Sequence, residues 1–513
     1  MQRELRPWPA LWALVIGFFM ILVDSTIVSV ANPAIMRGLD ADLTAVLWVT
    51  SAYLLAYAVP LLITGRLGDR FGPKNMYLIG LVIFTLSSLW CGLSGDIGML
   101  IAARVVQGLG AALMTPQTMA VITRIFPPNQ RGAAMGLWGA VAGIATLVGP
   151  ILGGVLVDTL GWEWIFIVNV PVGVIAFVLA LRLVPQLETH QHSFDWLGVV
   201  LSAVGMFLVI FGIQEGETYD WGTITGPITV WGLIITGLVV LVAFVVWQRF
   251  NRKEPLLPLG LFRDRNFSLA NGGITLVGLA IVAMPLPLTF YFQVARGLEP
   301  TQSALMLAPM AVVAGIMAPI IGRLTDRVDP KWIAAVGFAV TAASLAAMSL
   351  LITPDVELWV LLIPAAGLGL GTSGIWAPLA STATRNLPPA QAGAGSGVYN
   401  MTRQVGSVFG AAAITALLNA RLEANLPGFS ESGSQSSQAG QALPPQIAAG
   451  FTDAMSQALW LPVVAFALGA VLVLFFAKPK QTVAWGEGAG EHSGAAAWKD
   501  GAATTTGSLS AVD

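Results

Sequence analysis

Three ionisable side chains lie deep inside long apolar stretches of the sequence. Asp24 lies within FFMILVDSTIVSV, Arg104 within a run near residues 98–123, and Arg403 within a run near residues 394–418. A charged side chain at the centre of a bilayer costs roughly 2.5–3.5 kcal/mol on insertion scales. Such residues therefore face the interior of a helix bundle or a water-filled cavity, where they can pair, bind a ligand or exchange a proton.

Two interpretations of Asp24 follow. In the first, burial disfavours the charged carboxylate, so the side chain takes up and releases a proton as a cavity opens to each side in turn. Ser25, Thr26 and Ser29 would then supply a polar lining, and Arg104 would favour the ionised carboxylate whenever it comes near. In the second, Asp24 is a permanently ionised partner of Arg104 that only holds helices together.

A short motif occurs twice between apolar runs. GRLGDRFGPK at residues 65–74 returns as GRLTDRVDPK at residues 322–331. Similarly, RIFPPNQRG at residues 124–132 returns as RNLPPAQAG at residues 385–393. Two unrelated motifs repeated at nearly the same offset indicate an internal duplication. The chain is therefore predicted to contain two related halves with an additional segment between them.

Glycines in the first copy permit a tight turn and close approach of helices. Asp69 can interact with the N-terminal end of a helix from the other half, because the helix dipole there favours a carboxylate. These contacts would close one mouth of a cavity in one state, or the charges would serve only to orient the chain in the membrane. The residues expected to act in closure are Gly65, Asp69, Arg70, Gly72, Lys74, Gly322, Asp326 and Arg327.

The composition excludes several classes of protein. Of 513 residues, 56% are hydrophobic and only 10% are charged, whereas soluble proteins carry about 25% charged residues. The net charge of −2 gives no indication of a nucleic-acid partner. The three histidines and the single cysteine, Cys91, show no metal-site spacing. No cleavable signal, catalytic cluster or phosphate-binding loop is evident, so neither an enzyme nor a cofactor is expected.

Apolar runs of about 20 residues, the length that crosses a bilayer, predict fourteen helices and an all-α membrane protein. They lie near residues 11–32, 47–65, 76–95, 98–123, 134–157, 164–184, 196–215, 227–248, 268–294, 303–323, 332–352, 358–381, 394–418 and 457–477. When loops are assigned alternately, only Arg37, Arg296 and Arg421 fall outside, while most other Lys and Arg residues face the cytoplasm. This bias places both termini in the cytoplasm.

The expected organisation has four parts. Residues 1–184 form an N-terminal six-helix bundle, residues 185–266 contain two inserted helices, and residues 267–480 form a C-terminal six-helix bundle. The polar loop at residues 419–456 lies outside, with one short amphipathic piece near residues 445–455. Residues 481–513 are Gly-, Ala- and Thr-rich and are expected to form a disordered cytoplasmic tail.

These motifs resemble those of the major facilitator superfamily, and within it the fourteen-helix drug/proton antiporters of the EmrB/QacA type. GRLGDRFGPK resembles the superfamily's loop motif, with Pro73 where a basic residue is usual. RVVQGLG at residues 104–110 is similar to the fourth-helix motif linked in the family to proton coupling. LVDSTIVSVANP, around Asp24, and WEWIFIVNVPVG, residues 162–173, are typical of the fourteen-helix group.

The fifth-helix antiporter motif of that family is matched by Gly136, Gly149, Pro150, Gly153 and Gly154. Ala145 replaces one of its glycines. The residues alone favour close helix packing or a bendable hinge between the halves, which differ little in what they require. The resemblance adds that this motif accompanies export rather than uptake.

The resemblance implies two six-helix bundles that rock about a central site, plus two inserted helices. It implies a bacterial cytoplasmic-membrane antiporter that exports amphiphilic drugs in exchange for protons, with Asp24 and Arg104 in proton coupling. An exporter of a native metabolite, lipid or siderophore is the alternative, and a membrane enzyme or sensor is less well supported. We expect a monomer whose partners are the substrate, protons and lipid.

Arg403 has no acidic neighbour in its own helix and either binds substrate or bonds backbone carbonyls. The candidate substrate-binding residues are Tyr53, Tyr57, Trp138, Tyr291, Gln293, Trp376, Asn400 and Arg403.

Overall fold

The structure is a computed structural model that describes residues 6–41, 43–127, 130–189, 195–216, 218–251, 255–387, 391–426 and 445–477. All of these residues belong to one packed unit that ends at Ala477. The tail predicted at residues 481–513 and the middle of the loop predicted at residues 419–456 lie outside the described residues.

The N-terminal half consists of helices alone. They are α1 (Pro7–Gly38), α2 (Leu43–Ala58), α3 (Leu61–Phe71), α4 (Pro73–Gly92), α5 (Ile97–Ile125), α6 (Arg131–Thr159), α7 (Trp164–Ile167) and α8 (Asn169–Leu183). Helices α2 and α3 form one span that bends by 47° between them. Pro60 lies at this break, where the missing N–H and the bulk of the ring interrupt the helix.

The inserted segment follows the N-terminal half. It consists of α9 (Trp196–Gln214), a short hairpin of β1 (Thr223–Thr225) and β2 (Ile228–Thr229), and α10 (Val230–Phe250). The two strands are antiparallel, with Thr223 opposite Thr229. The sequence patterns did not predict this hairpin, because its strands are too short to show an alternating period.

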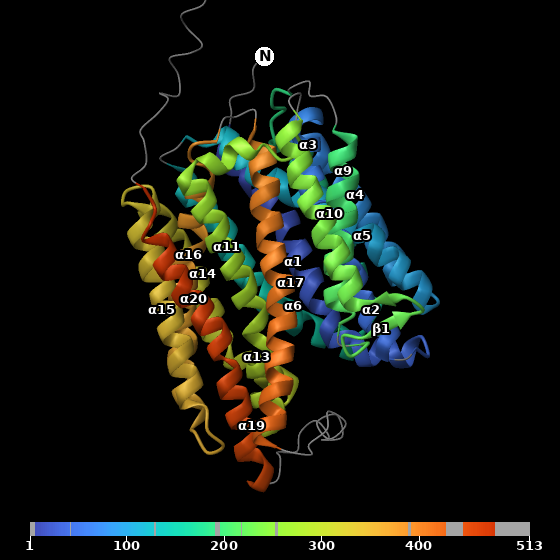
Figure 1. Ribbon diagram of the computed structural model, residues 1–513, viewed down its shortest axis with the longest axis vertical. Helices are drawn as coiled ribbons and strands as arrows, with labels where there is room; N and C mark the ends of the chain where they lie inside the picture. The colour runs from blue at the N-terminus through green and yellow to red at the C-terminus, as the bar shows by residue number, and fades with distance from the viewer. Residues whose placement is uncertain are drawn as a thin grey trace, which may run out of the picture. The chain divides into compact units, whose positions relative to one another are not determined.

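The C-terminal half contains several broken helices. Its elements are η2 (Leu259–Arg263), α11 (Arg265–Ala283), α12 (Pro285–Phe290), η3 (Tyr291–Ala295), α13 (Pro300–Met306), α14 (Ala308–Thr325), α15 (Pro330–Leu351), α16 (Leu358–Thr384), α17 (Ala392–Asn425), α19 (Pro445–Ala458) and α20 (Trp460–Val473). Figure 1 shows α17, in orange, running between α10 on one side and α11 and α20 on the other.

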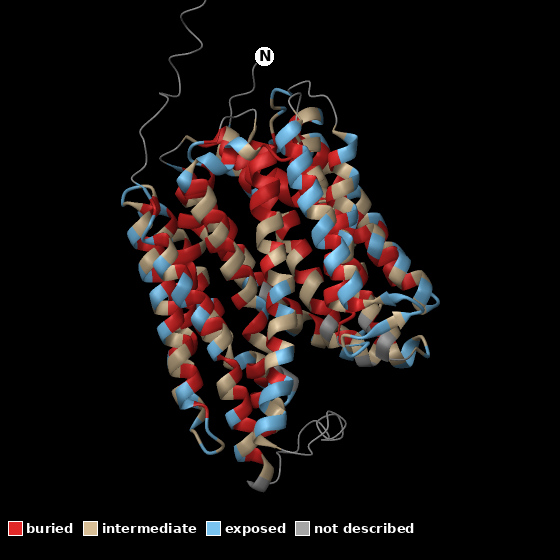
Figure 2. Ribbon diagram, in the orientation of Figure 1, coloured by how far each residue is buried: buried red, intermediate tan, exposed pale blue. Residues whose placement is uncertain are grey.

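Thirteen helices in the described part are long and apolar enough to cross a membrane, or fourteen if α2 and α3 count as one span. Large apolar side chains cover their outer faces, as at Leu86, Val239 and Ile363, each more than 60% exposed. Figure 2 shows this exposure along α9, α10 and α15, whereas buried residues gather in one end of α17. An apolar exterior of this extent is what a lipid environment requires. The prediction of an all-α membrane protein with fourteen spans is therefore confirmed.

Two helix ends differ from the prediction. Helix α17 continues past residue 418 to Asn425. The amphipathic piece predicted near residues 445–455 is the first part of the last span, because α19 runs on into α20. Phe451, Met455 and Leu459 are buried in the main apolar core, so packing rather than exposure decides the conformation of this segment.

Helix α9 contacts both halves of the chain. Leu55 of α2 and Met206 and Ile210 of α9 belong to one apolar cluster, against which Val405 and Val408 of α17 pack. The α9 and α10 helices are held together at one end by Asp195, which caps α9 and accepts hydrogen bonds from Trp247 and Gln248 at 2.9 and 2.8 Å. The inserted helices therefore form a pair that bridges α2 and α17.

Candidate functional site

The Asp24 carboxylate lies at the meeting point of α1, α5 and α8 and is fully buried. Its Oδ2 atom lies 2.5 Å from Nη1 of Arg104. Its Oδ1 atom accepts hydrogen bonds from Gln107 Nε2 and Asn169 Nδ2, both at 2.9 Å. Both oxygens of this buried carboxylate are therefore satisfied by charged or amide donors, as burial of an ion requires.

Arg104 is also fully buried and makes several further contacts. Its Nε donates to the Val49 carbonyl at 3.1 Å, and Nη1 also donates to Gln107 Oε1 at 2.7 Å. The guanidinium carbon lies 4.0 Å from the centre of the Tyr53 ring, within the range of a cation–π interaction. The Nη2 atom has no hydrogen-bond partner among the described residues, so the pairing of Arg104 is incomplete in this conformation.

Asn169 was not predicted as a member of this cluster, whereas Gln107 lies in the RVVQGLG motif. Asn169 donates to both Asp24 and Ser88, and Gln107 also donates to Ser88. A lone Asn in the apolar run WIFIVNVPVG was the available signal. Ser25 and Thr26, expected to line a cavity, instead donate to carbonyls of their own helix. The side chain of Ser29 lies outside the described residues.

The arrangement has a clear electrostatic consequence. One buried negative charge and one buried positive charge neutralise each other, so in this conformation Asp24 is the ion-pair partner that the second interpretation expects. Because the carboxylate is not exposed to solvent, proton exchange at Asp24 requires a conformation other than this one.

The first copy of the repeated loop contacts the other half of the chain. Asp69, at the end of α3, accepts hydrogen bonds from the Gly393 and Ala394 N–H groups, both at 2.9 Å. These are N–H groups of the first turn of α17, which have no partner within that helix. Arg124 lies 2.5 Å from the same carboxylate. We call the contact of Asp69 with Gly393 and Ala394 the first junction.

The second copy makes the equivalent contact with the two halves exchanged: its loop belongs to the C-terminal half and contacts a helix of the N-terminal half. Asp326 accepts hydrogen bonds from the Gly132 and Ala133 N–H groups in the first turn of α6, at 2.7 and 2.9 Å. Burial raises the pKa of the Asp326 carboxyl above its ordinary value, although these two backbone hydrogen bonds act in the opposite direction. We call the contact of Asp326 with Gly132 and Ala133 the second junction.

Glycines make both junctions possible. A Cβ atom on Gly65 would lie 2.4 Å from the Gly393 carbonyl oxygen, and one on Gly322 would lie 2.7 Å from the Gly132 carbonyl oxygen. Gly72 has a φ of 88° and lies between α3 and α4, a conformation that favours glycine.

Basic residues of the repeated GRL motif also make contacts of their own. Lys74 donates to the Leu181 carbonyl at 2.8 Å within the N-terminal half. Arg70 lies over the ring of Phe71, and Arg327 is exposed at the end of α14.

The glycines of the fifth-helix motif fall into two sets, because Gly149 and Gly153 approach their own half of the chain whereas Gly136 approaches the other half. A Cβ atom on Gly149 or Gly153 of α6 would collide with Thr26 or Ile27 of α1, whereas one on Gly154 would meet open space. Pro150 lies in the same stretch, inside α6. Gly149 and Gly153 therefore pack helices within one half in this conformation, and the hinge between the halves stays a prediction. At the other end of α6, Gly132 and Gly136 make the close contact with α14.

Aromatic residues bridge the halves in the first third of α6. Trp138 stacks on Phe18 of α1 with ring centres 4.7 Å apart, and it meets Trp376 of α16 edge to face at 6.0 Å. The Trp138 indole N–H is buried without a hydrogen-bond partner among the described residues. The predicted pair of tryptophans is thus brought together by the fold.

A second bridge joins α2 to α17. Arg403 Nη2 donates to the Tyr57 hydroxyl at 3.4 Å, and that hydroxyl donates to Thr115 of α5 at 3.3 Å. Tyr57 stacks on Tyr53 with ring centres 6.2 Å apart. Asn400 is fully buried and uses its Nδ2 atom to bond the Ser396 carbonyl of its own helix.

The remaining candidates lie apart from these bridges. Tyr291 is fully buried in η3, where its hydroxyl donates to the Thr353 carbonyl at 2.8 Å and accepts from Arg296. Gln293 lies in the same turn. The bonds of Tyr291 fasten the end of a broken span to the segment after α15, which is a structural role in this conformation.

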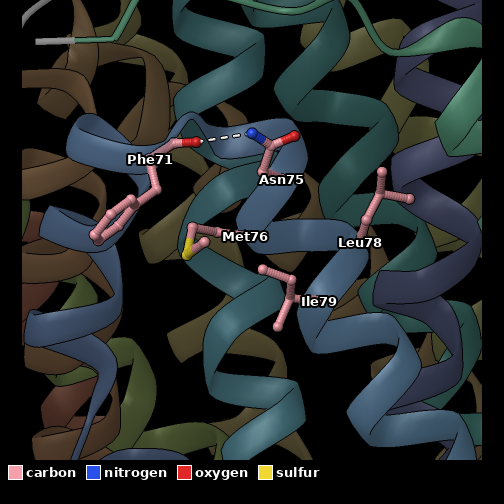
Figure 3. Close-up of a pocket in the computed structure, with 5 residues that line it drawn as sticks. All are labelled: Phe71, Asn75, Met76, Leu78 and Ile79. Atoms are coloured by element: carbon pink, nitrogen blue, oxygen red, sulfur yellow. Dashed lines mark hydrogen bonds between the residues drawn. The ribbon is translucent and has the colours of Figure 1, made fainter.

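A groove of about 390 Å³ lies elsewhere, along α3 and α4 (Figure 3). It is lined by Phe71, Asn75, Met76, Leu78 and Ile79. None of the candidate substrate residues contributes to it, so the groove is separate from them. Within the described residues, no group of three or more His, Cys, Asp or Glu side chains could hold a metal ion.

Comparisons with known proteins agree with this architecture. The model of the Major Facilitator Superfamily matches residues 14–411. The chain is 51% identical over 475 residues to the uncharacterized MFS-type transporter Rv1250 of Mycobacterium tuberculosis, covering 92% of this chain and 81% of that protein. It is 35% identical over 437 residues to the tetracenomycin C resistance and export protein of Streptomyces glaucescens, covering 82% and 79%.

A solved structure shows the same fold. The human organic anion transporter MFSD10 superimposes with a TM-score of 0.62 at 13% sequence identity, covering 91% of this chain and 100% of that one. At this identity the likeness concerns the fold alone. The family model, the two relatives and the paired junctions together show that this chain is a multi-pass transporter of the cytoplasmic membrane and belongs to the Major Facilitator Superfamily.

Proposed function

We propose that this protein exports amphiphilic small molecules from the cytoplasm in exchange for protons. The observation that carries the proposal is the buried Asp24–Arg104 pair, held by Gln107 and Asn169 among three helices. A fully buried ion pair is costly compared with apolar packing. A transporter can use such a pair if a proton and an arginine compete for one carboxylate.

Protonation of Asp24 would leave the positive charge of Arg104 buried without its counter-ion. Loss of one partner from a buried pair costs about 3–5 kcal/mol, which is enough to change the balance between two conformations by more than a hundredfold. Arg104 already has an unpartnered Nη2 atom, so its other hydrogen bonds do not compensate. The neutral and charged forms of Asp24 would therefore favour different conformations.

The two junctions give this change a mechanical consequence. Both attach a loop of one half to the first turn of a helix in the other half. From the distribution of Lys and Arg we infer that these loops lie on the cytoplasmic side, in which case the described conformation is closed towards the cytoplasm. Substrate would leave to the outside from conformations closed towards the cytoplasm, whereas a proton would reach Asp24 only in a different conformation that exposes the carboxylate as the halves rock.

The substrate class follows from the side chains between the halves. Phe18, Trp138 and Trp376 supply large aromatic surfaces, which suit flat, partly apolar molecules. The similarity to a tetracenomycin C exporter supports the same class.

Transport in inverted membrane vesicles tests the proposal. A growth screen of an expressing strain against toxic compounds, beginning with tetracenomycin C, would first select the compound. An acidified vesicle lumen should then drive its accumulation, with each charge moved across 100 mV contributing about 2.3 kcal/mol. The Asp24→Asn variant should lose this accumulation while remaining in the membrane.

The matched control is Asp453→Asn, the same substitution at an exposed position of α19. It should transport like the unmodified protein. Accumulation that ignores the proton gradient would exclude antiport, and gradient-driven accumulation by Asp24→Asn would remove Asp24 from the coupling mechanism.

A further inference from the structure

Arg403 is a charged side chain in the middle of α17 with no carboxylate to neutralise it. The ion pairs in the described part of the chain are Arg104 with Asp24 and Arg124 with Asp69, and Arg403 takes part in neither. Its one side-chain hydrogen bond is the 3.4 Å contact of Nη2 with the Tyr57 hydroxyl. A guanidinium has five N–H donors, so most of its donor capacity is unused.

Arg403 is only partly buried, and the burial of its Nε atom makes the lack of an acceptor there costly. The Nε atom of Arg403 is shielded from solvent and has no acceptor among the described residues. A buried charged donor without a partner is unfavourable, and an arginine does not lose its proton to relieve the cost. Nor is Asp24 available to it, since Arg104, Gln107 and Asn169 occupy both of its oxygens.

Two more unpartnered polar atoms lie one turn away. Tyr399 and Asn400 precede Arg403 by four and three residues, which places them on the same face of α17. Both side chains are fully buried. The Tyr399 hydroxyl and the Asn400 Oδ1 atom have no hydrogen-bond partner in the described part.

The cluster of Arg403, Tyr399 and Asn400 is also connected to the Asp24–Arg104 pair. Arg403 bonds Tyr57, Tyr57 stacks on Tyr53, and the Tyr53 ring lies under the guanidinium of Arg104. A ligand at Arg403 would therefore contact a chain of side chains that crosses from α17 to the Asp24 site.

We propose that Arg403 binds an anionic group of the transported molecule, with the Tyr399 hydroxyl as a second donor and Asn400 Oδ1 as an acceptor for a substrate N–H or O–H. The preferred substrates are then amphiphiles with a carboxylate, sulfonate or phosphate, rather than organic cations. A planar guanidinium matches such oxyanions with two parallel hydrogen bonds. The inference rests on the proposed export function and specifies its substrate class.

Three probes with the same apolar body and different charges test this specificity. Pyrenebutyrate is anionic, pyrenebutanol is neutral and pyrenebutyl-trimethylammonium is cationic. Equilibrium binding to the purified full-length protein in lipid nanodiscs should be at least tenfold tighter for the anion than for the cation. Arg403→Gln should weaken binding of the anion roughly ten- to hundredfold, the range for a hydrogen bond between charged groups, and change binding of the alcohol less than threefold.

Two further variants keep the test decisive. Arg403→Lys retains the charge but lacks the planar fork, so it should bind the anion with intermediate affinity. Arg421→Gln makes the same change at an exposed position of the same helix and should leave all three affinities unchanged. Should Arg403→Gln fail to fold, Arg403→Lys and Tyr399→Phe, which should weaken only the anion, provide the comparison.

The outcomes separate the two proposals. Equal affinities for the anion and the cation, or loss of affinity for all three probes alike in a folded Arg403 variant, would overturn the role of Arg403. Binding that follows this pattern, but without proton-driven accumulation of any probe in inverted vesicles, would support the Arg403 site and reject the export function.

Discussion

The two junctions share one geometry but differ in their surroundings. Asp69 and Asp326 each accept two backbone hydrogen bonds from the first turn of a helix in the other half. Asp69 is fully buried and forms an ion pair with Arg124. Asp326 is partly exposed, and the corresponding arginine, Arg385, acts on it only as a nearby charge.

This difference shows what the duplication preserved. A carboxylate that accepts hydrogen bonds at a helix N-terminus is favourable in either environment, because the N–H groups lack other partners and the dipole attracts a negative charge. Loss of the carboxylate costs more free energy where it is buried and paired with an arginine, because the arginine is then left without its counter-ion. We therefore expect the first junction to supply most of the free energy that closes this face of the transporter.

Asp69→Asn should have the largest effect. It leaves Arg124 without its counter-ion and weakens two hydrogen bonds, at a cost of about 3–5 kcal/mol to the closed conformation. Ser396→Cys, at a buried position of α17 near the junction, can report opening through its reaction with a membrane-impermeant maleimide. Labelling should rise roughly a hundredfold, and an unchanged rate would mean that Asp69 does not hold the face closed. The unmodified protein, whose single Cys91 is buried, gives the background.

Gly65→Ala should come next. Its Cβ would lie 2.4 Å from a backbone oxygen of α17, and such overpacking costs typically 1–3 kcal/mol. Gly322→Ala, at 2.7 Å from the Gly132 oxygen, should open the face less. Gly154→Ala is the control, since its Cβ meets open space. Equal labelling of all three variants in the Ser396→Cys background would contradict this order.

Asp326→Asn should have a smaller effect than Asp69→Asn. The change leaves no buried counter-ion without its partner. Only the charge-assisted part of two hydrogen bonds is lost, which costs the closed conformation about 1–2 kcal/mol of free energy. Maleimide labelling should rise roughly tenfold. If it rises as much as in Asp69→Asn, the two junctions are equivalent despite their different burial.

Arg385→Gln should have the smallest effect. Its side chain is exposed, and exposed charges contribute at most about 1 kcal/mol. Arg124→Gln, at the equivalent position of the first junction, is the matched comparison and should raise labelling several times more. High salt should reduce the effect of Arg385→Gln further, because exposed charges are screened.

Much of this architecture can be predicted from the sequence. Apolar runs of about 20 residues give the spans, since a bilayer leaves few alternatives to a helix. The repeated GRL motif predicts that Asp69 meets a helix N-terminus in the other half, and the structure shows this contact. Asp24 and Arg104 are conspicuous because charges are rare in such runs, and the structure pairs them.

Other features depend on three-dimensional contacts that sequence spacing does not encode. Asn169 contacts Asp24 from a helix 145 residues away in the sequence. A single amide in an apolar run has no repeating pattern around it from which such a contact could be predicted. The sequence is equally compatible with a hinge between the halves at Gly149 and Gly153 or with close packing, and only the structure shows their contact with α1. Tyr291 was predicted to line the substrate cavity, but its hydroxyl donates a hydrogen bond to the carbonyl of Thr353, which is distant in the sequence.

The bridging position of α9 has a consequence for the transport cycle. Because α9 touches α2 in one half and α17 in the other, it cannot stay rigidly attached to both when the halves rotate apart. The surfaces involved carry Val, Met, Ile and Leu side chains, which can slide past one another without breaking hydrogen bonds. Helices α9 and α10 would then cover the interface between the halves and keep lipid out of it as it widens. Their apolar contacts would add little resistance to the motion.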